Sequence, residues 1–399
     1  MTDAAATQAT TPVRAETPGA WRYSPQLALV LSGGGARAAY QVGVLAGLAE
    51  RLPGLAFPIL TGVSAGAINA AYLAAQPADF KTRVAGLQHE WFGLTGERIY
   101  RVRGAHLTAD AIRSAWSAAT GRPRPPVNMH GLLDTQPLRE FLTRAVDMAG
   151  LDRSISAGRL RALALSASSY TTGVSVTFVH GTADTPTWTR AQRVGIHATL
   201  SVEHIMASAA LPIVFPAVPL GDDFYGDGSV SQIAPLAPAI HLGAKAIVAI
   251  GPTNASLAAA AVPTGTYPSA AEVLGLLFRA VFLDALEADA ERLRRVNRTV
   301  AAFPAGTHPV DGLRPIALLL IRPSRELASF AQGNDMLLPR SVRLVVRAIG
   351  GDRAAAADFL GHLLFHPNHT SQLANLGYED VAARWPEIET FFETLERTG

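Results

Sequence analysis

Hydrophobic residues along the chain form short runs that alternate with longer stretches of helical spacing. The short apolar runs predict buried strands at 26–31, 57–60, 160–168, 175–180, 246–250 and 316–321. Apolar residues at helical spacing predict helices at 38–52, 65–75, 134–149, 204–211, 270–300, 341–349, 354–364 and 381–395. Because the first strands and helices alternate, we expect an α/β fold with a parallel sheet and helices on its faces.

Two regions stand apart from this alternation. Residues 78–126 are less regular and predict an insertion of helices and loops that could cover a site. The helix at 270–300 is apolar nearly all round in its first half and strongly charged in its second. Such a helix could be buried in the core, form a dimer face or lie on a membrane, and burial is the simplest of the three.

Composition narrows the class of protein. Of the 399 residues, 49% are hydrophobic and 17% are charged, which suits one large domain with additions or two domains. No apolar run approaches the ~18 residues of a membrane-spanning helix. The net charge is +2 without a basic run interleaved with aromatic residues, so we expect no nucleic-acid partner. The absence of cysteine excludes disulfides, thiolate metal sites and a cysteine nucleophile.

The first candidate for chemistry is a serine between the strand at 57–60 and the helix at 65–75. Gly62 and Gly66 flank Ser64 in a Gly-x-Ser-x-Gly pattern. A sharp strand-to-helix turn exposes the serine hydroxyl, and the helix N-terminus favours negative charge beside it. This pattern is typical of a nucleophile, but an ordinary turn with a helix-capping serine fits it as well.

A glycine-rich turn follows the strand at 26–31 and has two interpretations. A phosphate-binding loop fits poorly, because Ala38 stands where the dinucleotide fingerprint needs its third glycine and no Walker lysine is present. An oxyanion hole, made of unshielded backbone N–H groups, fits a nucleophile about 30 residues later. Arg37 follows in the first helical turn. It could form a salt bridge, face solvent, orient the loop or bind an anionic head group.

Further candidates lie downstream. The short helix at 204–211 consists of small residues, which suit either core packing or a contact to the site. Asp227 stands between Gly226 and Gly228, in a buried turn or in an ordinary hairpin turn. A Ser-His-Asp hydrolase of this kind would need a histidine that follows the serine and the aspartate in the sequence. The candidates, none in a compelling context, are His241, His362, His366 and His369.

Four blocks in this order resemble the patatin-like phospholipases. That family has a strand ending in Gly-Gly-Gly-x-Arg-Gly, then Gly-x-Ser-x-Gly, then Ala-Ser-x-Ala-x-Pro-x-x-Phe, and then Asp-Gly-Gly or Asp-Gly-Ala. The matching blocks are Gly33–Ala38, Gly62–Gly66, Ala207–Phe215 and Asp227–Ser229. The resemblance covers about residues 28–243. Ala38 and Ser229 depart from it, and each could narrow the site without removing a reacting group.

The resemblance implies a Ser-Asp dyad instead of a triad. Ser64 would be the nucleophile, and Asp227 the base that accepts its proton and returns it to the leaving alcohol. Backbone N–H groups of the loop Gly33, Gly34, Gly35 and Ala36 would bind the oxyanion. Supporting roles would fall to Arg37, Gly62, Gly66 and Gly228. No metal or other cofactor is expected.

Together these observations predict a three-layer α/β/α sandwich with a largely parallel sheet. We expect a disordered tail at 1–25, without the features of a signal peptide, and a catalytic domain at 28–243. We expect residues 244–399 to form a strand-and-helix extension that packs on the sheet, makes a homo-oligomer or touches lipid.

The expected activity is hydrolysis of a phospholipid, a lysophospholipid or another lipid ester. We expect it in the cytoplasm, with transient contact to a membrane surface. An acyltransferase that uses the same acyl-serine, and a non-catalytic lipid-binding protein of the same fold, are the alternatives. The head group, the acyl chain length and the oligomeric state do not follow from the sequence.

Overall fold

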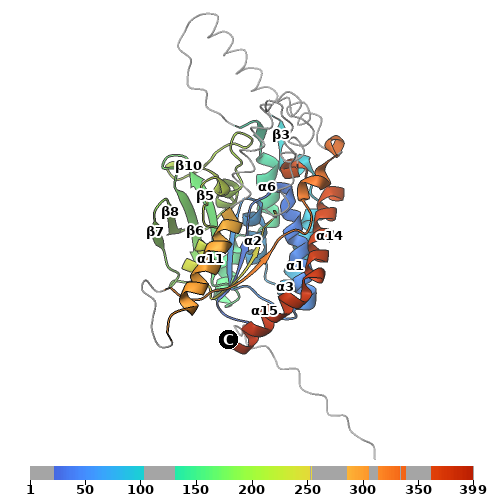
Figure 1. The fold of residues 1–399 in the computed structure, drawn as a ribbon. Helices are drawn as coiled ribbons and strands as arrows, with labels where there is room; N and C mark the ends of the chain where they lie inside the picture. Colours follow the sequence, from blue (N-terminus) through green and yellow to red (C-terminus); the bar gives the residue numbers. More distant parts are fainter. Residues whose placement is uncertain are drawn as a thin grey trace, which may run out of the picture.

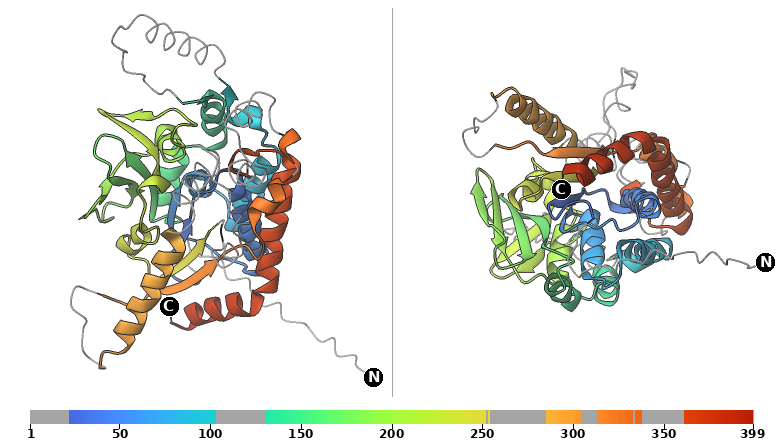
Figure 2. Two further views of the ribbon diagram at one scale, coloured as in Figure 1. Left: turned by 45° about the horizontal axis from the view of Figure 1, so that its top comes forward. Right: turned by 90° about the horizontal axis from the view of Figure 1, so that it is seen from below.

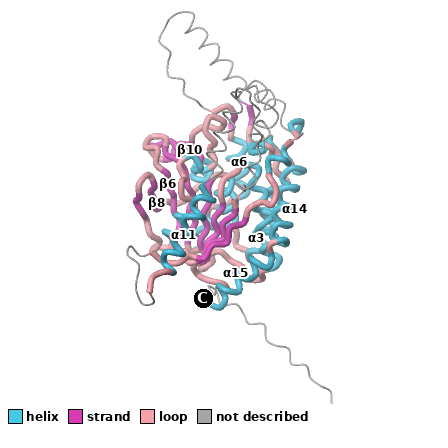
Figure 3. Tube along the Cα trace, in the orientation of Figure 1, coloured by secondary structure: helices cyan, strands magenta, loops and turns pink. Residues whose placement is uncertain are grey.

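The computed structural model describes residues 22–102, 131–251, 253, 285–304, 313–332, 334–337 and 361–398. Within them a central sheet is covered by helices on both faces (Figures 1 and 3). Several predicted segments lie outside the described residues. They are most of the N-terminal tail, residues 103–126 of the predicted insertion, the first half of the helix at 270–300, the helix at 341–349 and most of the helix at 354–364.

The central sheet has ten strands and is mostly parallel. Its bounds are β1 (Leu27–Leu31), β2 (Ile59–Val63), β5 (Ala162–Ser169), β6 (Ser175–Gly181), β7 (Trp188–Arg190), β8 (Arg193–His197), β9 (Val218–Leu220), β10 (Asp223–Asp227), β11 (Ala246–Ile250) and β12 (Ala317–Ile321). Strands β12, β11, β1, β2 and β5 run parallel in that order. Strand β10 pairs antiparallel with β5, and a separate ribbon joins β3 (Arg101–Val102) to β4 (Leu133–Asp134).

The helices are of ordinary length for a globular protein. They are α1 (Ala39–Arg51), α2 (Ala65–Ala75), α3 (Phe80–Phe92), α4 (Gly96–Ile99), α6 (Gln136–Ala145), α7 (Ala149–Ser156), α8 (Val202–Ser208), α9 (Ala237–His241), α11 (Ala285–Ala301), α14 (Pro367–Ala383) and α15 (Trp385–Thr398). Short 3-10 turns are η1 (Gly35–Ala38), η2 (Gly228–Val230), η5 (Leu327–Ala331) and η6 (Asp335–Leu337). None of the helices in the described part is long and apolar enough to cross a bilayer.

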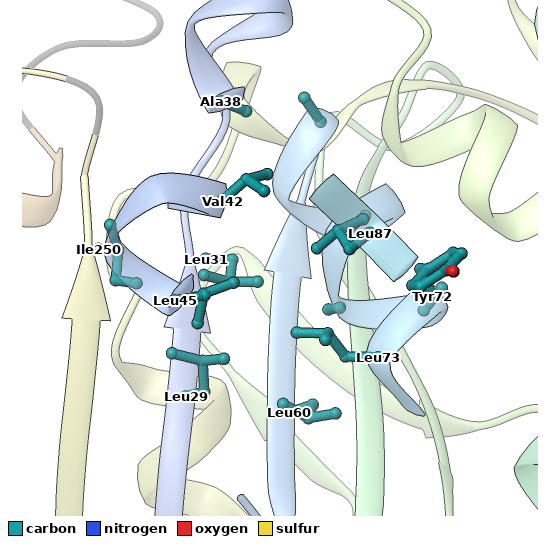
Figure 4. Packing of buried hydrophobic residues seen from close by; sticks show 14 of the residues in the cluster. Leu29, Leu31, Ala38, Val42, Leu45, Leu60, Tyr72, Leu73, Leu87 and Ile250 are labelled. Atoms are coloured by element: carbon teal, nitrogen blue, oxygen red, sulfur yellow. The ribbon is translucent and has the colours of Figure 1, made fainter. Parts of the chain in front are cut away.

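The two faces of β1 explain the three layers. Its side chains alternate, so Leu29 and Leu31 face the larger core, where α1 and α2 pack on them. Figure 4 shows Val42 and Leu45 of α1 over these two leucines. Ala28 and Val30 point to the opposite face, where the side chains of α9 and α11 cover them. The three-layer α/β/α sandwich predicted from the sequence is therefore confirmed.

The part of the chain after residue 243 contributes directly to the sheet and to the helices that cover it. Strand β11 lies next to β1 within the sheet, with Ile250 in register with Leu31, and β12 follows it. Helix α14 runs alongside α1 (Figure 2). The two helices approach closely at Gly43, where a Cβ atom would lie 1.7 Å from the carbonyl oxygen of Ala374. Residues beyond 243 thus build part of the central sheet and of the helix layer that contains α1.

Several predicted boundaries differ from the structure. The single helix predicted at 381–395 is wrong, because two helices, α14 and α15, meet at Arg384. Pro386 explains the break, since proline disfavours helical backbone in the residue before it and lacks an N–H donor. The helix predicted to end at 149 ends at Ala145, and α7 begins a new one at Ala149. At the start of the described chain, Tyr23 packs edge-on against Phe392, with ring centroids 5.0 Å apart.

Candidate active site

Ser64 lies at a strained turn between β2 and α2. Its φ of 56° and ψ of −131° fall in a region that non-glycine residues rarely adopt. Its backbone N–H donates to both the carbonyl oxygen and the Oγ of Ser208, each at 3.1 Å. The Ser64 side chain makes no capping hydrogen bond to α2, which removes the helix-capping alternative. The hydroxyl is therefore held out of the helix and is available for chemistry.

Glycine is needed on both sides of this turn. A Cβ at Gly62 would lie 2.5 Å from the carbonyl oxygen of Gly66. A Cβ at Gly66 would lie 2.2 Å from the carbonyl oxygen of Leu31 in β1. No side chain fits at either distance, so the Gly-x-Ser-x-Gly pattern reflects close backbone packing.

The carboxyl group of Asp227 is fully buried at the end of β10. Its Oδ1 accepts the backbone N–H of Ser229 at 2.9 Å, whereas Oδ2 accepts no hydrogen bond of regular geometry from the described residues. Burial raises the pKa of Asp227 to about 6, against the opposing effect of hydrogen bonding by Ser64 and Ser229. The chain passes from Asp227 into η2 and not into a two-residue hairpin, so the hairpin alternative is wrong.

The end of α8 and the small residues that follow it fix the relative position of Ser64 and Asp227. Ser208, at the end of α8, accepts the N–H of Ser64 and donates its own hydroxyl to the carbonyl oxygen of Ser166 at 2.6 Å. Two residues later, the carbonyl oxygen of Ala210 accepts the N–H of Asp227 at 2.8 Å. The predicted helix at 204–211 is thus a contact to the site and core structure at once. Sequence reasoning did not single out Ser208, although the Ala-Ser block contained it.

The glycine loop after β1 presents backbone donors without acceptors. Gly34 and Gly35 have φ values of 158° and 55°. Among the described residues, the N–H groups of Gly33, Gly34, Gly35 and Ala36 donate to no protein acceptor. A Cβ at Gly35 would lie 2.3 Å from the carbonyl oxygen of His362, so the C-terminal region packs directly on this loop. Unsatisfied N–H groups beside a serine suit an oxyanion hole.

A buried polar network holds the base of the loop. Gln41 donates to the carbonyl oxygen of Ser32 at 2.7 Å and accepts from Asn69 at 2.9 Å. Asn69 in turn accepts the indole N–H of Trp91 at 2.7 Å. Gln41 and Asn69 lie inside alanine-rich helices, and a polar residue at a core position was the signal that sequence reasoning passed over.

Arg37 is 3% exposed, so the solvent-facing alternative is wrong. A Cβ at Gly361 would come within 2.8 Å of Arg37 Nε, which places the guanidinium against that backbone. Arg37 thus connects the glycine loop to the segment from 361 onward.

An apolar cavity opens at Ser64. It is lined by Gly35, Ser64, Ala65, Ile68, Trp91, Leu94, Ile99, Leu138, Phe141, Ala209, Leu211, Phe215, His362, Leu363 and Phe365, and its empty volume is about 490 Å³ including the open mouth. Trp91, Leu94 and Ile99 come from the region predicted to be an insertion over the site. Nearly all of the lining is hydrocarbon, which suits an alkyl chain.

Residues 29–240, more than half of the chain, match the family described as Patatin-like phospholipase. The chain belongs to the patatin-like phospholipase family. No curated protein is similar enough in sequence to count as a relative of this patatin-like chain.

Solved structures resemble the patatin-like chain only loosely. Human GIVD cytosolic phospholipase A2 matches over 94% of this chain and 61% of its own, with 13% identity and a TM-score of 0.46. VipD from Legionella pneumophila matches over 88% and 67%, with 14% identity and a TM-score of 0.32. The heterodimeric complex ExoU–SpcU from Pseudomonas aeruginosa matches over 84% and 69%, with 18% identity and a TM-score of 0.26. The chain thus spans about three fifths of the human phospholipase, and this similarity says nothing about its activity.

The two departures from the patatin-like pattern are accommodated without distortion. Ala38 has a φ of −66°, an ordinary helical value in which its methyl group is tolerated. Ser229 keeps the backbone N–H that Asp227 needs, and its Oγ is buried without a hydrogen bond of regular geometry from the described residues.

The candidate histidines have different surroundings. His241 stacks on Trp188 with ring centroids 4.7 Å apart, and His366 caps α14 by accepting the N–H of Asn368. His369 is buried, and burial lowers its pKa to about 4 with a further effect from Arg37. His362 lines the apolar cavity of this patatin-like site together with Ser64. Hydrogen bonding by Ser64 lowers the pKa of the Asp227 carboxyl group, against the larger effect of burial.

Proposed function

We propose that the protein is a serine acyl-ester hydrolase that acts on phospholipid, lysophospholipid or similar lipid esters. The observation that supports this most is the strained Ser64 beside the buried carboxyl group of Asp227. Unbonded backbone donors of the glycine loop and an apolar cavity adjoin the same serine. Each feature has a use in ester hydrolysis, and membership in the family favours a lipid substrate.

The proposed reaction has two steps. Ser64 Oγ attacks the ester carbonyl carbon while its proton passes to Asp227, and the bond to the alcohol then breaks as Asp227 returns the proton to that oxygen. Water next attacks the acyl-serine, and its proton follows the same route through Asp227 to Ser64. The carboxylic acid leaves and the free serine is restored.

Backbone donors must supply much of the rate, because a carboxylate is a weak base for a serine hydroxyl. The N–H groups of Gly34, Gly35 and Ala36 would bind the negative oxygen in both steps. Each donor of this kind contributes about 10²–10³-fold to the rate in enzymes where one has been removed.

The acyl chain would occupy the apolar cavity. Its walls combine Ile68 of α2, Phe141 of α6 and Phe365 of the C-terminal region, so three distant parts of the chain enclose the alkyl group. Burying the chain there removes hydrocarbon from water at about 25 cal/mol per Å².

Two substitutions test the dyad. Ser64→Ala and Asp227→Asn should each lower fatty-acid release from a p-nitrophenyl acyl ester by at least about 10³-fold, because each removes a reacting group. Ser154→Ala is the control, since it removes another buried hydroxyl that has no partner among the described residues and does not line the apolar cavity. Activity near wild type in either dyad variant would contradict the assignment.

Product analysis on a mixed lipid extract then separates the alternatives. Free acid that depends on Ser64 supports a hydrolase. Transfer products in excess of free acid, when an acceptor alcohol is present, would instead make the protein an acyltransferase. Equal product from wild type and Ser64→Ala would leave only a lipid-binding role.

A further inference from the structure

A second cavity opens at the same edge of the sheet as Ser64, and its lining mixes polar and apolar residues. Ser32, Ser229, Gln232, Glu287 and Arg322 are among its polar members, beside apolar ones such as Leu320, and its empty volume is about 450 Å³ including its mouth. Its lining shares no residue with the apolar cavity. A site with one purely apolar cavity and one that also offers polar and charged groups can separate the two halves of an ester.

The register of the sheet places this cavity beside the dyad. Ser32 and Arg322 directly follow β1 and β12, and the carboxyl ends of these parallel strands lie at one edge, where ligands of α/β proteins bind. Val63 directly precedes Ser64 in the chain. Ser229 donates its N–H to Asp227 and lines the same cavity. The lining thus includes one residue directly attached to each group of the proposed dyad, Val63 before Ser64 and Ser229 bonded to Asp227.

Arg322 gives the cavity a cation that is only partly engaged. Its Nη1 donates to Glu287 Oε1 at 2.6 Å, and its side chain is 38% exposed. That bond uses one of the five N–H donors of a guanidinium, whose planar arrangement matches phosphate oxygens. Arg322 can therefore bind an anion while Glu287 keeps its bond.

We propose that this second cavity receives the alcohol half of the ester, and that Arg322 selects a phosphate-bearing head group. The inference rests on the proposed hydrolase function and names its substrate class. An ester bound at Ser64 has its acyl chain on one side of the carbonyl carbon and its alcohol on the other. With the chain in the apolar cavity, the alcohol meets Gly33, Ser229 and Arg322.

The distances suit a glycerophosphate. Three strand spacings separate β2 from β12, about 14 Å in all. The extended side chain of Arg322 covers part of that span, and a glycerol phosphate reaching out from the ester covers the rest. A simple alcohol without phosphate would leave Arg322 out of reach.

The test compares soluble substrates that share one acyl chain. Wild type and Arg322→Gln are assayed on a monomeric short-chain lysophosphatidic acid, on the matching monoacylglycerol and on the p-nitrophenyl ester. The kcat/KM for lysophosphatidic acid should fall about 10- to 100-fold, the usual loss for a hydrogen bond to a charged group. The other two substrates should change by less than about twofold. Glu287→Gln should raise hydrolysis of lysophosphatidic acid alone, because it removes a competing carboxylate.

A control variant and two added anions make the result specific. Arg153→Gln removes an arginine that is also paired with one carboxylate, Asp147, but lines neither cavity, and it should change nothing. Glycerol 3-phosphate should inhibit p-nitrophenyl ester hydrolysis by wild type and much less by Arg322→Gln. If inorganic phosphate alone inhibits through Arg322 while the substrate preference is unchanged, the cavity binds free phosphate and the proposal is overturned.

Failure of the inference differs from failure of the proposed function. Equal losses on all three substrates, or no loss on any, would overturn the role of Arg322 while the hydrolase assignment stands. If wild type hydrolyses none of the esters, the hydrolase assignment fails. Calorimetry with glycerol 3-phosphate then tests the role of Arg322 independently of activity. Binding to wild type that is lost in Arg322→Gln supports this role, and the absence of binding to wild type overturns it.

Discussion

At the scale of single residues, the site depends on a carboxyl group kept out of water. Asp227 is fully buried, and the charged form of a buried acid is disfavoured. Its pKa of about 6 makes it a stronger base than an exposed aspartate while it stays ionised near neutral pH. If Asp227 is the base proposed above, this burial has consequences for the rate as well as for the free energy of unfolding.

The rate should follow the ionisation of Asp227. We expect kcat/KM on a p-nitrophenyl ester to rise tenfold per pH unit below about pH 6 and to level off above it, since only the carboxylate accepts the serine proton. Initial rates between pH 4.5 and 8, with circular dichroism at each pH as a check on folding, measure this. A profile that is flat down to pH 5 would rule out Asp227 as the base.

Ionisation of Asp227 lowers the free energy of unfolding, whereas ionisation of a hydrogen-bonded aspartate with a lowered pKa raises it. The pKa of Asp227 is higher in the folded than in the unfolded chain, so ionisation above about pH 6 destabilises the fold, by up to about 3 kcal/mol. This penalty disappears as the pH falls below about 4. Asp227→Asn should therefore raise the melting temperature at pH 7.5 and leave it unchanged at pH 3.5.

Asp223 on the same strand is the matched control. Burial alone would raise the pKa of Asp223, but hydrogen bonds from Ser169 and Thr171 outweigh burial and lower it. Asp223→Asn should thus lower the melting temperature at neutral pH. If both asparagine variants lower the melting temperature by the same amount at pH 7.5, burial does not destabilise the charged form of Asp227.

At the scale of elements, the sequence indicated the order of strands and helices well where apolar runs were continuous. Strand β11 lies where it was predicted, because five apolar residues in a row have few alternatives to a buried strand. Helix α14 was missed, since small and polar residues such as Thr370, Gly377 and Asp380 interrupt the apolar spacing of its buried face. Close packing on α1 replaces hydrophobic bulk there, and a pattern of hydrophobicity does not show it.

The candidate site was predictable for a related reason. Gly62 and Gly66 flank Ser64 in the sequence, so local geometry suggested either a nucleophile or a helix cap there, and the resemblance to the family then implied the dyad with Asp227. The partners that hold them, Ser208 and Gln41, act through backbone contacts between distant elements. His362 and Phe365 reach the site from the far end of the chain, and a single sequence does not show such contacts.

At the scale of the whole molecule, an exposed apolar surface lies near the dyad. It consists of Tyr170, Phe224, Val230 and Ile233, each between 44% and 60% exposed. The pairing of β10 with β5 places Phe224 beyond the carboxyl end of β2, at the same edge of the sheet as Ser64. Exposed apolar side chains grouped at a substrate entrance suit contact with a lipid surface.

Removing this surface should weaken action on lipid vesicles only. Phe224→Ser with Ile233→Ser should reduce flotation with phospholipid vesicles and hydrolysis of vesicle lipids several-fold, because less hydrocarbon enters the lipid. The monomeric p-nitrophenyl ester should be hydrolysed as before. Phe303→Ser with Leu313→Ser, two exposed residues on the segments that precede β12, is the matched control. Equal flotation of both double variants would exclude the surface as the contact.

The pairing of β11 with β1 bears on how the protein can be shortened. A fragment limited to residues 29–240, which match the family, would lack β11 and the first two residues of β1, and the remaining Leu29–Leu31 would become the edge of the sheet. Apolar residues with unpaired backbone groups invite pairing with another copy, which leads to aggregation. The same fragment would expose the side of α1 that α14 covers. A working minimal enzyme must therefore keep the C-terminal strands and helices, and insolubility of the shorter piece would say nothing about its catalytic residues.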